Sequence, residues 1–102
     1  MLKISEDFSD APGARFEADG PDSGEEFFKR LLKPRFEEAA RQDRLLLVDL
    51  DDTFGYASSF LSEAFSSLEE EFGVENVKAR VRIKSDDDPD LIDFVNEIIE
   101  GN

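Results

Sequence analysis

The fold is decided by one stretch of the chain, Leu45-Leu46-Leu47-Val48-Asp49-Leu50. It is almost continuously apolar, which is typical of a strand that is covered on both faces in the middle of a sheet. Residues 51–57 begin with two aspartates and contain a glycine, so they predict a loop. After the loop, apolar residues recur at helical spacing from Phe60 to Phe72, and we expect Gly73 to end that helix. The stretch therefore predicts a central strand that leads through a loop into an amphipathic helix.

Downstream of this helix, residues 77–84 alternate between apolar and cationic side chains. This pattern predicts a strand with one apolar face and one solvated face, and we expect it to lie parallel to the central strand through a right-handed crossover. Asp88 and Pro89 have the composition of an N-cap and a first helical residue, so a last helix is expected after them. The solvated face would carry four cations, Lys78, Arg80, Arg82 and Lys84.

Upstream of the central strand, residues 2–4 and 15–18 also alternate, and Pro12-Gly13 between them is typical of a turn. These segments predict a short β-hairpin. Ser23 and Glu26 have the spacing of a capping box, which predicts a helix that begins there. Pro34 lacks a backbone donor and is expected to kink or split this helix near Lys33.

The predicted order is β-β-α-β-α-β-α. A chain of 102 residues has the usual size of one domain, so we predict a single domain over residues 1–102. The fold class is α/β, with a mixed four-stranded sheet. Because one strand face is cationic, the helices are expected mainly on the opposite face of the sheet.

Composition excludes several kinds of function. The chain has no cysteine, histidine or tryptophan, which excludes disulfides, zinc fingers, haem ligation and Ser-His-Asp or Cys-His catalysis, and no cofactor is predicted. Its 26 acidic and 12 basic side chains give a formal charge of −14, which argues against nucleic acids and anionic membranes as partners. The first residues lack a signal-peptide pattern and no apolar stretch approaches the ~20 residues of a membrane span, so a cytoplasmic protein is expected.

The stretch Gly55-Tyr56-Ala57-Ser58-Ser59-Phe60-Leu61 places a pair of serines at the start of a helix. A strand that ends in Asp49, followed by a short loop, two serines and a helix, resembles the STAS domain of anti-sigma-factor antagonists. In that family a serine that opens this helix is phosphorylated. The resemblance implies that Ser58 is the phosphoacceptor and Ser59 the second serine. Ala57 and Phe60 stand where the family has Asp and Gly.

The sequence also resembles a more specific family, the STAS-like domains of unknown function. The resemblance rests on the serine stretch together with Pro12-Gly13-Ala14-Arg15 and Ser23-Gly24-Glu25-Glu26-Phe27, and it extends over nearly the whole chain. Members are often encoded beside, or fused to, a histidine-kinase-type ATPase. The resemblance implies a non-enzymatic regulatory protein-interaction domain with such an ATPase as its partner, switched by serine phosphorylation. The candidate partner-binding residues are Tyr56, Phe60, Asp51 and Asp52.

Two of these residues also have a structural interpretation. A hydroxyl at a helix start is first of all an N-cap, worth roughly 1 kcal/mol, and Ser58 fits that role. The helical spacing of Phe60 equally indicates core packing. Loop 49–58 and the run Asp86-Asp87-Asp88 are expected to leave the same sheet edge, so the sequence predicts an acidic rim around Ser58.

Two alternatives from other functional classes stay open. The run Asp49-Leu50-Asp51-Asp52-Thr53 resembles the first motif of haloacid-dehalogenase-type phosphatases. In that interpretation Asp49 attacks phosphorus and binds magnesium, Asp51 is the acid and base, and a downstream acidic residue such as Asp86 completes the metal site. The other alternative is a structural module that forms a homodimer through a strand edge or helix face.

Overall fold

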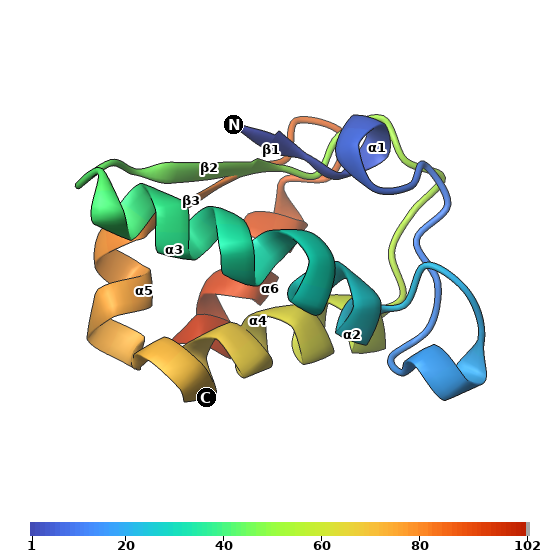
Figure 1. The fold of residues 1–102 in the computed structure, drawn as a ribbon. Helices are drawn as coiled ribbons and strands as arrows, with labels where there is room; N and C mark the ends of the chain where they lie inside the picture. Colours follow the sequence, from blue (N-terminus) through green and yellow to red (C-terminus); the bar gives the residue numbers. More distant parts are fainter. Residues whose placement is uncertain (102) are drawn as a thin grey trace.

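The computed structural model describes residues 1–101 (Figure 1). Its elements are β1 (Leu2–Lys3), α1 (Ile4–Asp7), the 3-10 helix η1 (Glu17–Asp19), α2 (Gly24–Phe27), the π-helical turn η2 (Phe28–Leu32), α3 (Lys33–Arg41), β2 (Leu46–Asp49), α4 (Ser58–Phe72), α5 (Val74–Arg80), β3 (Val81–Lys84) and α6 (Asp90–Ile99).

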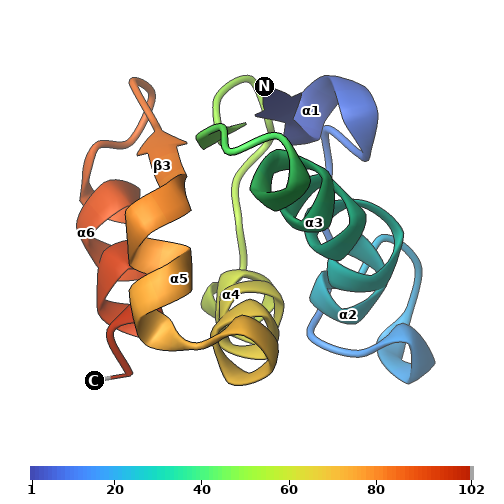
Figure 2. The ribbon, with the colours of Figure 1, turned by 60° about the vertical axis from the view of Figure 1, so that its left-hand side comes forward.

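The sheet has the order β1-β2-β3, and both strand pairs are parallel. Leu46 is opposite Val81 in the β2–β3 pair, and Leu2 is opposite Val48 in the β1–β2 pair. The predicted central strand and its parallel neighbour are therefore confirmed. The predicted four-stranded mixed sheet is wrong, since the described residues form three parallel strands. The longer helices lie below the sheet in Figure 1, and Figure 2 shows the same layering from a second side.

The predicted β-hairpin is wrong because its second segment serves another purpose. The carbonyl oxygens of Ala14 and Arg15 accept hydrogen bonds from the backbone nitrogens of Gly24 and Glu25, at 2.9 and 3.0 Å. These amides belong to the first turn of α2, where backbone N–H groups have no hydrogen-bond acceptor within the helix. The segment thus caps a helix, and β1 pairs with β2 instead of with a hairpin partner.

The predicted strand over residues 77–84 is half wrong. Residues 77–80 form the end of helix α5, and only residues 81–84, strand β3, are extended. Gly73 has φ 89° and ends α4, as predicted, and it leads directly into α5. Val77 in α5 and Val81, the first residue of β3, are both buried. The four cations are divided between a helix and a strand, so they do not share one strand face.

The first long helix begins as predicted and bends without breaking. The hydroxyl of Ser23 accepts from the backbone nitrogen of Glu26 at 3.0 Å. The chain then runs through α2, η2 and α3, and the π-helical turn ends at Leu32, two residues before Pro34. A wider turn accommodates a residue that has no N–H to donate, so helical backbone continues past the proline.

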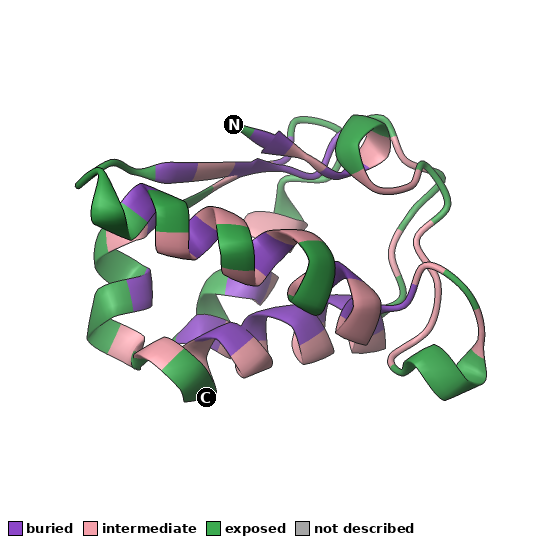
Figure 3. Cartoon of the chain, viewed as in Figure 1, coloured by how far each residue is buried: buried purple, intermediate pink, exposed green. Residues whose placement is uncertain are grey.

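The core lies between the helices and the sheet, where the buried segments face each other in Figure 3. The rings of Phe27 and Phe60 stack with centroids 5.6 Å apart, which joins α2 to the start of α4. Gly24 is required there, because a Cβ on it would collide with the backbone carbonyl of Phe60. Among residues 1–101, no helix is long and apolar enough to cross a membrane.

Candidate functional site

The candidate site lies where the three parallel strands end. The loop after β2 and the loop after β3 meet at this edge, next to the end of β1, at the right of the sheet in Figure 1. Acidic side chains come from both loops and a lysine from each outer strand. We call this region the acidic end; its carboxylates are Asp49, Asp51, Asp52, Asp86, Asp87 and Asp88.

Lys84 lies at the centre of the acidic end. Its Nζ is 2.6 Å from Oδ2 of Asp51, 2.9 Å from Oδ2 of Asp86 and 3.9 Å from Oδ2 of Asp49. The hydrogen bond to Asp51 is the largest cause of a raised pKa for the Lys84 ammonium. The lysine stays charged and balances the carboxylates of both loops, which ties the two loops together.

Asp51 is the buried member of this cluster, with 5 % of its surface exposed. Its Oδ1 accepts a hydrogen bond from the backbone nitrogen of Asp87 at 2.8 Å. This hydrogen bond is the largest cause, and the one from Lys84 the second largest, of a pKa that is lowered to about 2 despite desolvation. A carboxylate held by an amide and an ammonium stays ionised. The structure therefore places Asp51 inside the site, where it joins the loops, and not on the surface.

Asp52 and Asp49 have different surroundings. The Asp52 side chain is 66 % exposed and forms an ion pair with Lys3 at 2.6 Å, which raises the pKa of Lys3. The backbone of Asp52 has φ 66° and its nitrogen donates to Oδ2 of Asp87. Asp49 is buried, and its Oδ1 accepts the backbone nitrogen of Asp51 at 2.9 Å. Of the predicted carboxylates in the first loop, Asp52 is the one a partner can reach.

The three carboxylates of the phosphatase alternative do come together, around an ammonium group. Lys84 Nζ lies between Asp49, Asp51 and Asp86. Among residues 1–101, no group of three or more acidic side chains is arranged to hold a metal ion. The geometry is that of an ion-pair network.

Ser58 is the first residue of α4, and its side chain is exposed. Ala57 is the N-cap, without a side-chain hydrogen bond, so the prediction that Ser58 is the N-cap is wrong. The first turn of α4 carries no acidic residue, and Ser59 is half-buried. The Ser58 hydroxyl forms no hydrogen bond with any residue that the structure describes. It is therefore accessible at an uncapped helix start.

A groove of about 340 Å³ opens beside Ser58, between the start of α4 and the start of α6. The Tyr56 hydroxyl donates to the carbonyl of Leu50 at 2.9 Å, and burial raises the pKa of Tyr56. Tyr56 packs on Phe60, whose side chain is fully buried in the core. The groove is lined by Tyr56, Ser58, Leu61, Asp90, Leu91 and Phe94. Tyr56 thus borders an accessible surface, whereas Phe60 does not.

Sequence reasoning missed Phe54, which is 87 % exposed. Its backbone nitrogen donates to the carbonyl of Asp10 at 2.8 Å, so the loop is held while the ring faces solvent. The signal was present in the sequence, since Phe54 is an aromatic residue outside every helical or strand periodicity. The roles of Lys3 and Lys84 were missed because only the fold brings them to the acidic loops.

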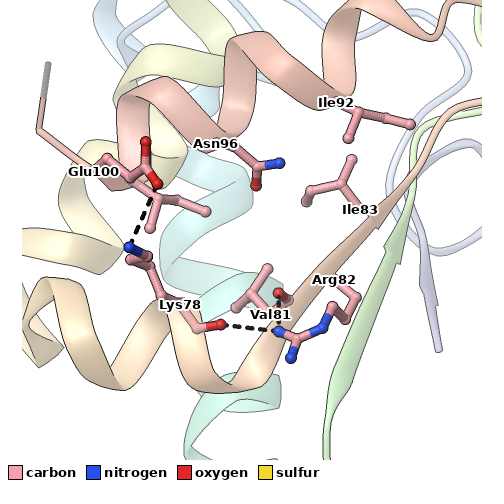
Figure 4. Close-up of a pocket in the computed structure, with 8 residues that line it drawn as sticks. Lys78, Val81, Arg82, Ile83, Ile92, Asn96 and Glu100 are labelled. Atoms are coloured by element: carbon pink, nitrogen blue, oxygen red, sulfur yellow. Dashed lines mark hydrogen bonds and ion pairs between the residues drawn. The ribbon is translucent and has the colours of Figure 1, made fainter.

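A second groove of about 360 Å³ lies elsewhere, between α6 and the segment formed by α5 and β3 (Figure 4). Lys78 pairs with Glu100 at 3.4 Å across one end. Arg82 donates to the carbonyls of Lys78 and Val81, at 2.9 Å each. These contacts commit the cations to helix ends.

The comparisons with known proteins agree with the fold. A family model described as a STAS-like domain of unknown function matches residues 23–91, about two thirds of the chain. The match begins at the Ser23 cap and contains β2, α4, the Ser58 region and β3. No curated protein and no solved structure matches the chain. The protein therefore belongs to the family of STAS-like domains of unknown function.

Proposed function

We propose that the protein is a non-enzymatic regulatory domain that binds a histidine-kinase-type ATPase and is switched by phosphorylation of Ser58. The observation that carries this proposal is the exposed hydroxyl of Ser58 at the first residue of α4, beside the groove that Tyr56 and Phe94 border. Membership of the STAS-like family supports a regulatory interaction domain. The ATPase partner and the phosphorylation switch are what we propose in addition.

The start of α4 suits a phosphate. The helix has 15 residues, its N-cap is an alanine, and no carboxylate occupies the first turn. Free backbone amides and the positive end of the helix dipole both favour an anion at this position. In the reaction the Ser58 oxygen bonds to the γ-phosphorus of ATP, the bond to ADP breaks, and the hydroxyl proton passes to a base of the ATPase.

Phosphorylation would change the charge of the docking surface. Asp90 lines the same groove as Ser58, and Asp86, Asp87 and Asp88 are exposed in the preceding loop. A phosphate adds about two negative charges to this surface. A partner that inserts apolar groups beside Ser58 then has to bury that charge, so the unmodified form binds and the phosphorylated form is released.

The test uses histidine-kinase-type ATPases from the same genome, first of all one encoded next to this protein, with ATP and magnesium. We expect a complex in size-exclusion chromatography and a phosphate on Ser58 by mass spectrometry, with loss of the complex after modification. Ser58→Ala should abolish phosphorylation, and Ser59→Ala, one residue further into the helix, is the matched control that should keep it. The proposal is refuted if the experiment yields neither a complex nor a phosphate on Ser58.

The non-enzymatic part has its own test. The full chain is assayed with magnesium and a generic phosphate ester, and we expect no hydrolysis. Hydrolysis that Asp49→Asn removes would establish the phosphatase alternative, because Asp49 is the nucleophile in that mechanism.

A further inference from the structure

The two ends of the sheet carry opposite charge. Opposite the acidic end, the strands begin beside the last turns of α3 and α5, at the left of Figure 1. We call this region the basic end; its cations are Arg35, Arg41, Arg44 and Arg80. Arg35, Arg41 and Arg44 form no ion pair with any residue between 1 and 101, and Arg80 pairs with Asp43 at 3.5 Å. In a chain of charge −14, the basic end is where uncompensated cations gather.

Each end also exposes large apolar side chains. Phe54 is 87 % exposed at the acidic end, and Leu45 is 60 % exposed at the basic end. Leu45 borders a groove of about 160 Å³ in which two arginines outnumber one carboxylate; its other lining residues are Met1, Arg35, Glu38, Ala39, Arg44 and Leu46. An enclosed cavity of about 150 Å³ is large enough to hold benzene, so this groove, which is open to solvent and partly polar, has the volume for one phenyl ring.

We propose that copies of this chain associate head to tail, with Phe54 of one copy seated in the groove at the basic end of the next. The ring would lie against Leu45, with the guanidinium groups of Arg35 and Arg44 over its face, as in a cation–π contact. Asp52, two residues from Phe54 and 66 % exposed, would face the same arginines. This inference does not depend on the proposed function.

The acidic end is organised for such a contact before association. The nitrogen of Phe54 is bonded to Asp10, and the nitrogen of Gly55 to the hydroxyl of Thr53 at 3.2 Å. The side chain of Asp52 is held by Lys3, and its backbone nitrogen donates to the side chain of Asp87. A loop that is already ordered loses little conformational entropy when it binds.

Charge complementarity selects the occupant of the groove and the orientation of the contact. Two acidic ends, or two basic ends, would bring like charges together and repel each other. An acidic end against a basic end pairs carboxylates with arginines. The net charge opposes any association at long range, but salt confines that repulsion to about 10 Å. A contact between unlike ends leaves a free end on each copy of a pair, so it predicts assemblies larger than a dimer, either open chains or closed rings.

The experiment measures sedimentation equilibrium of the full chain over a wide concentration range near physiological ionic strength. For the native protein the average mass should rise with concentration without a plateau at the dimer. Phe54→Ala, which blocks the acidic end, and the double variant Arg44→Glu with Leu45→Ser, which blocks the basic end, should each weaken association at least about tenfold. Phe16→Ala, at an exposed phenylalanine in another loop, is the matched control and should leave association unchanged.

Mixing the two blocked variants tests the orientation. Each retains one functional end, so together they should form a one-to-one dimer that grows no further. Association of either variant alone would overturn the proposal in favour of a symmetric contact through its intact end. A native protein that stays monomeric at all concentrations would also overturn it, and circular dichroism of each variant checks that the exposed substitutions leave the fold intact.

Discussion

The acidic and basic ends use their charged side chains in opposite ways. At the acidic end, carboxylates accept hydrogen bonds from backbone amides of the loops, as Asp51 does from Asp87 and Asp49 from Asp51. At the basic end, Arg80 donates to the carbonyls of Ala39 and Arg44, at 3.4 and 2.9 Å. One end of the molecule thus satisfies free N–H groups and the other satisfies free carbonyl groups.

The direction of the helices explains this difference. The acidic loop 85–89 leads into the start of α6, whose first turn contains Asp90 and Asp93. The helices α3 and α5 end at the opposite edge, in Arg41 and Arg80. Helix starts carry unpaired amides and a partial positive charge, and helix ends carry the reverse. The uneven charge of the chain therefore follows the polarity of its backbone.

The largest effect is expected from Asp51→Ala. It leaves the Asp87 amide without its partner and removes the closest carboxylate of Lys84, in a site that is largely shielded from water. We expect a loss of about 3 kcal/mol in the free energy of unfolding, measured by urea denaturation. Asp52→Ala is the control: it removes an exposed ion pair and should cost less than about 1 kcal/mol. Equal losses for both variants would contradict the assigned difference in burial.

The second prediction concerns pH. Because the pKa of Asp51 is lowered to about 2 in the folded protein, its contribution to stability is present above about pH 4 and is lost as the pH falls from about 4 towards 2. The contribution is on the order of 2 kcal/mol. The difference in unfolding free energy between the native protein and Asp51→Asn should therefore shrink in this range, and a constant difference would argue against a lowered pKa.

The basic end provides the third prediction. Arg80→Ala leaves the Arg44 carbonyl without its side-chain donor and removes a second donor from the Ala39 carbonyl, which keeps the bond from the Arg44 nitrogen, and we expect a loss of about 1 kcal/mol. Arg80→Lys should not restore it fully, since the guanidinium contacts the carbonyls through Nη1 and Asp43 through Nη2, whereas an ammonium has a single nitrogen. Arg41→Ala is the control, because Arg41 is exposed and forms no ion pair among the described residues. If Arg80→Ala is as stable as the native protein, Arg80 does not cap the end of this segment.

The smallest effect is expected from Tyr56→Phe. It removes the hydroxyl that bonds the Leu50 carbonyl and keeps the ring against Phe60. The loss should be about 1 kcal/mol or less by urea denaturation, because a net hydrogen bond contributes that much. Tyr56→Leu should cost more, since it also removes the aromatic contact, and the reverse order would show that the ring does not pack as described.

Much of the fold could be predicted where local pattern and tertiary context agree. The apolar run before Asp49 became β2, the helix from Ser58 to Phe72 matches its periodicity, and Ser23 caps α2. The irregularity expected near Lys33 is present as the π-helical turn η2, and helical backbone continues past Pro34. The strand predicted over residues 77–84 is only half present, because an alternating pattern does not show that α5 ends at Arg80 and β3 begins at Val81.

Less of the candidate site could be predicted. The sequence indicated that the loops after β2 and β3 would meet. It also indicated Ser58 as the candidate phosphoacceptor at the start of a helix. It could not show that Asp51 and Phe60 are buried while Phe54 is exposed, because these residues differ in what surrounds them and not in their spacing.

The sequence by itself determined the class of fold, the central strand, the start of α4 and the excess of negative charge. These depend on short-range periodicity, capping and composition, which each segment carries on its own. Only the tertiary structure decided the parallel pairing of β1 with β2, the capping of α2 by residues 14 and 15, and the ion pairs of Lys3 and Lys84. Those contacts join residues far apart in the chain, and only the packing of helices against the sheet brings them within reach.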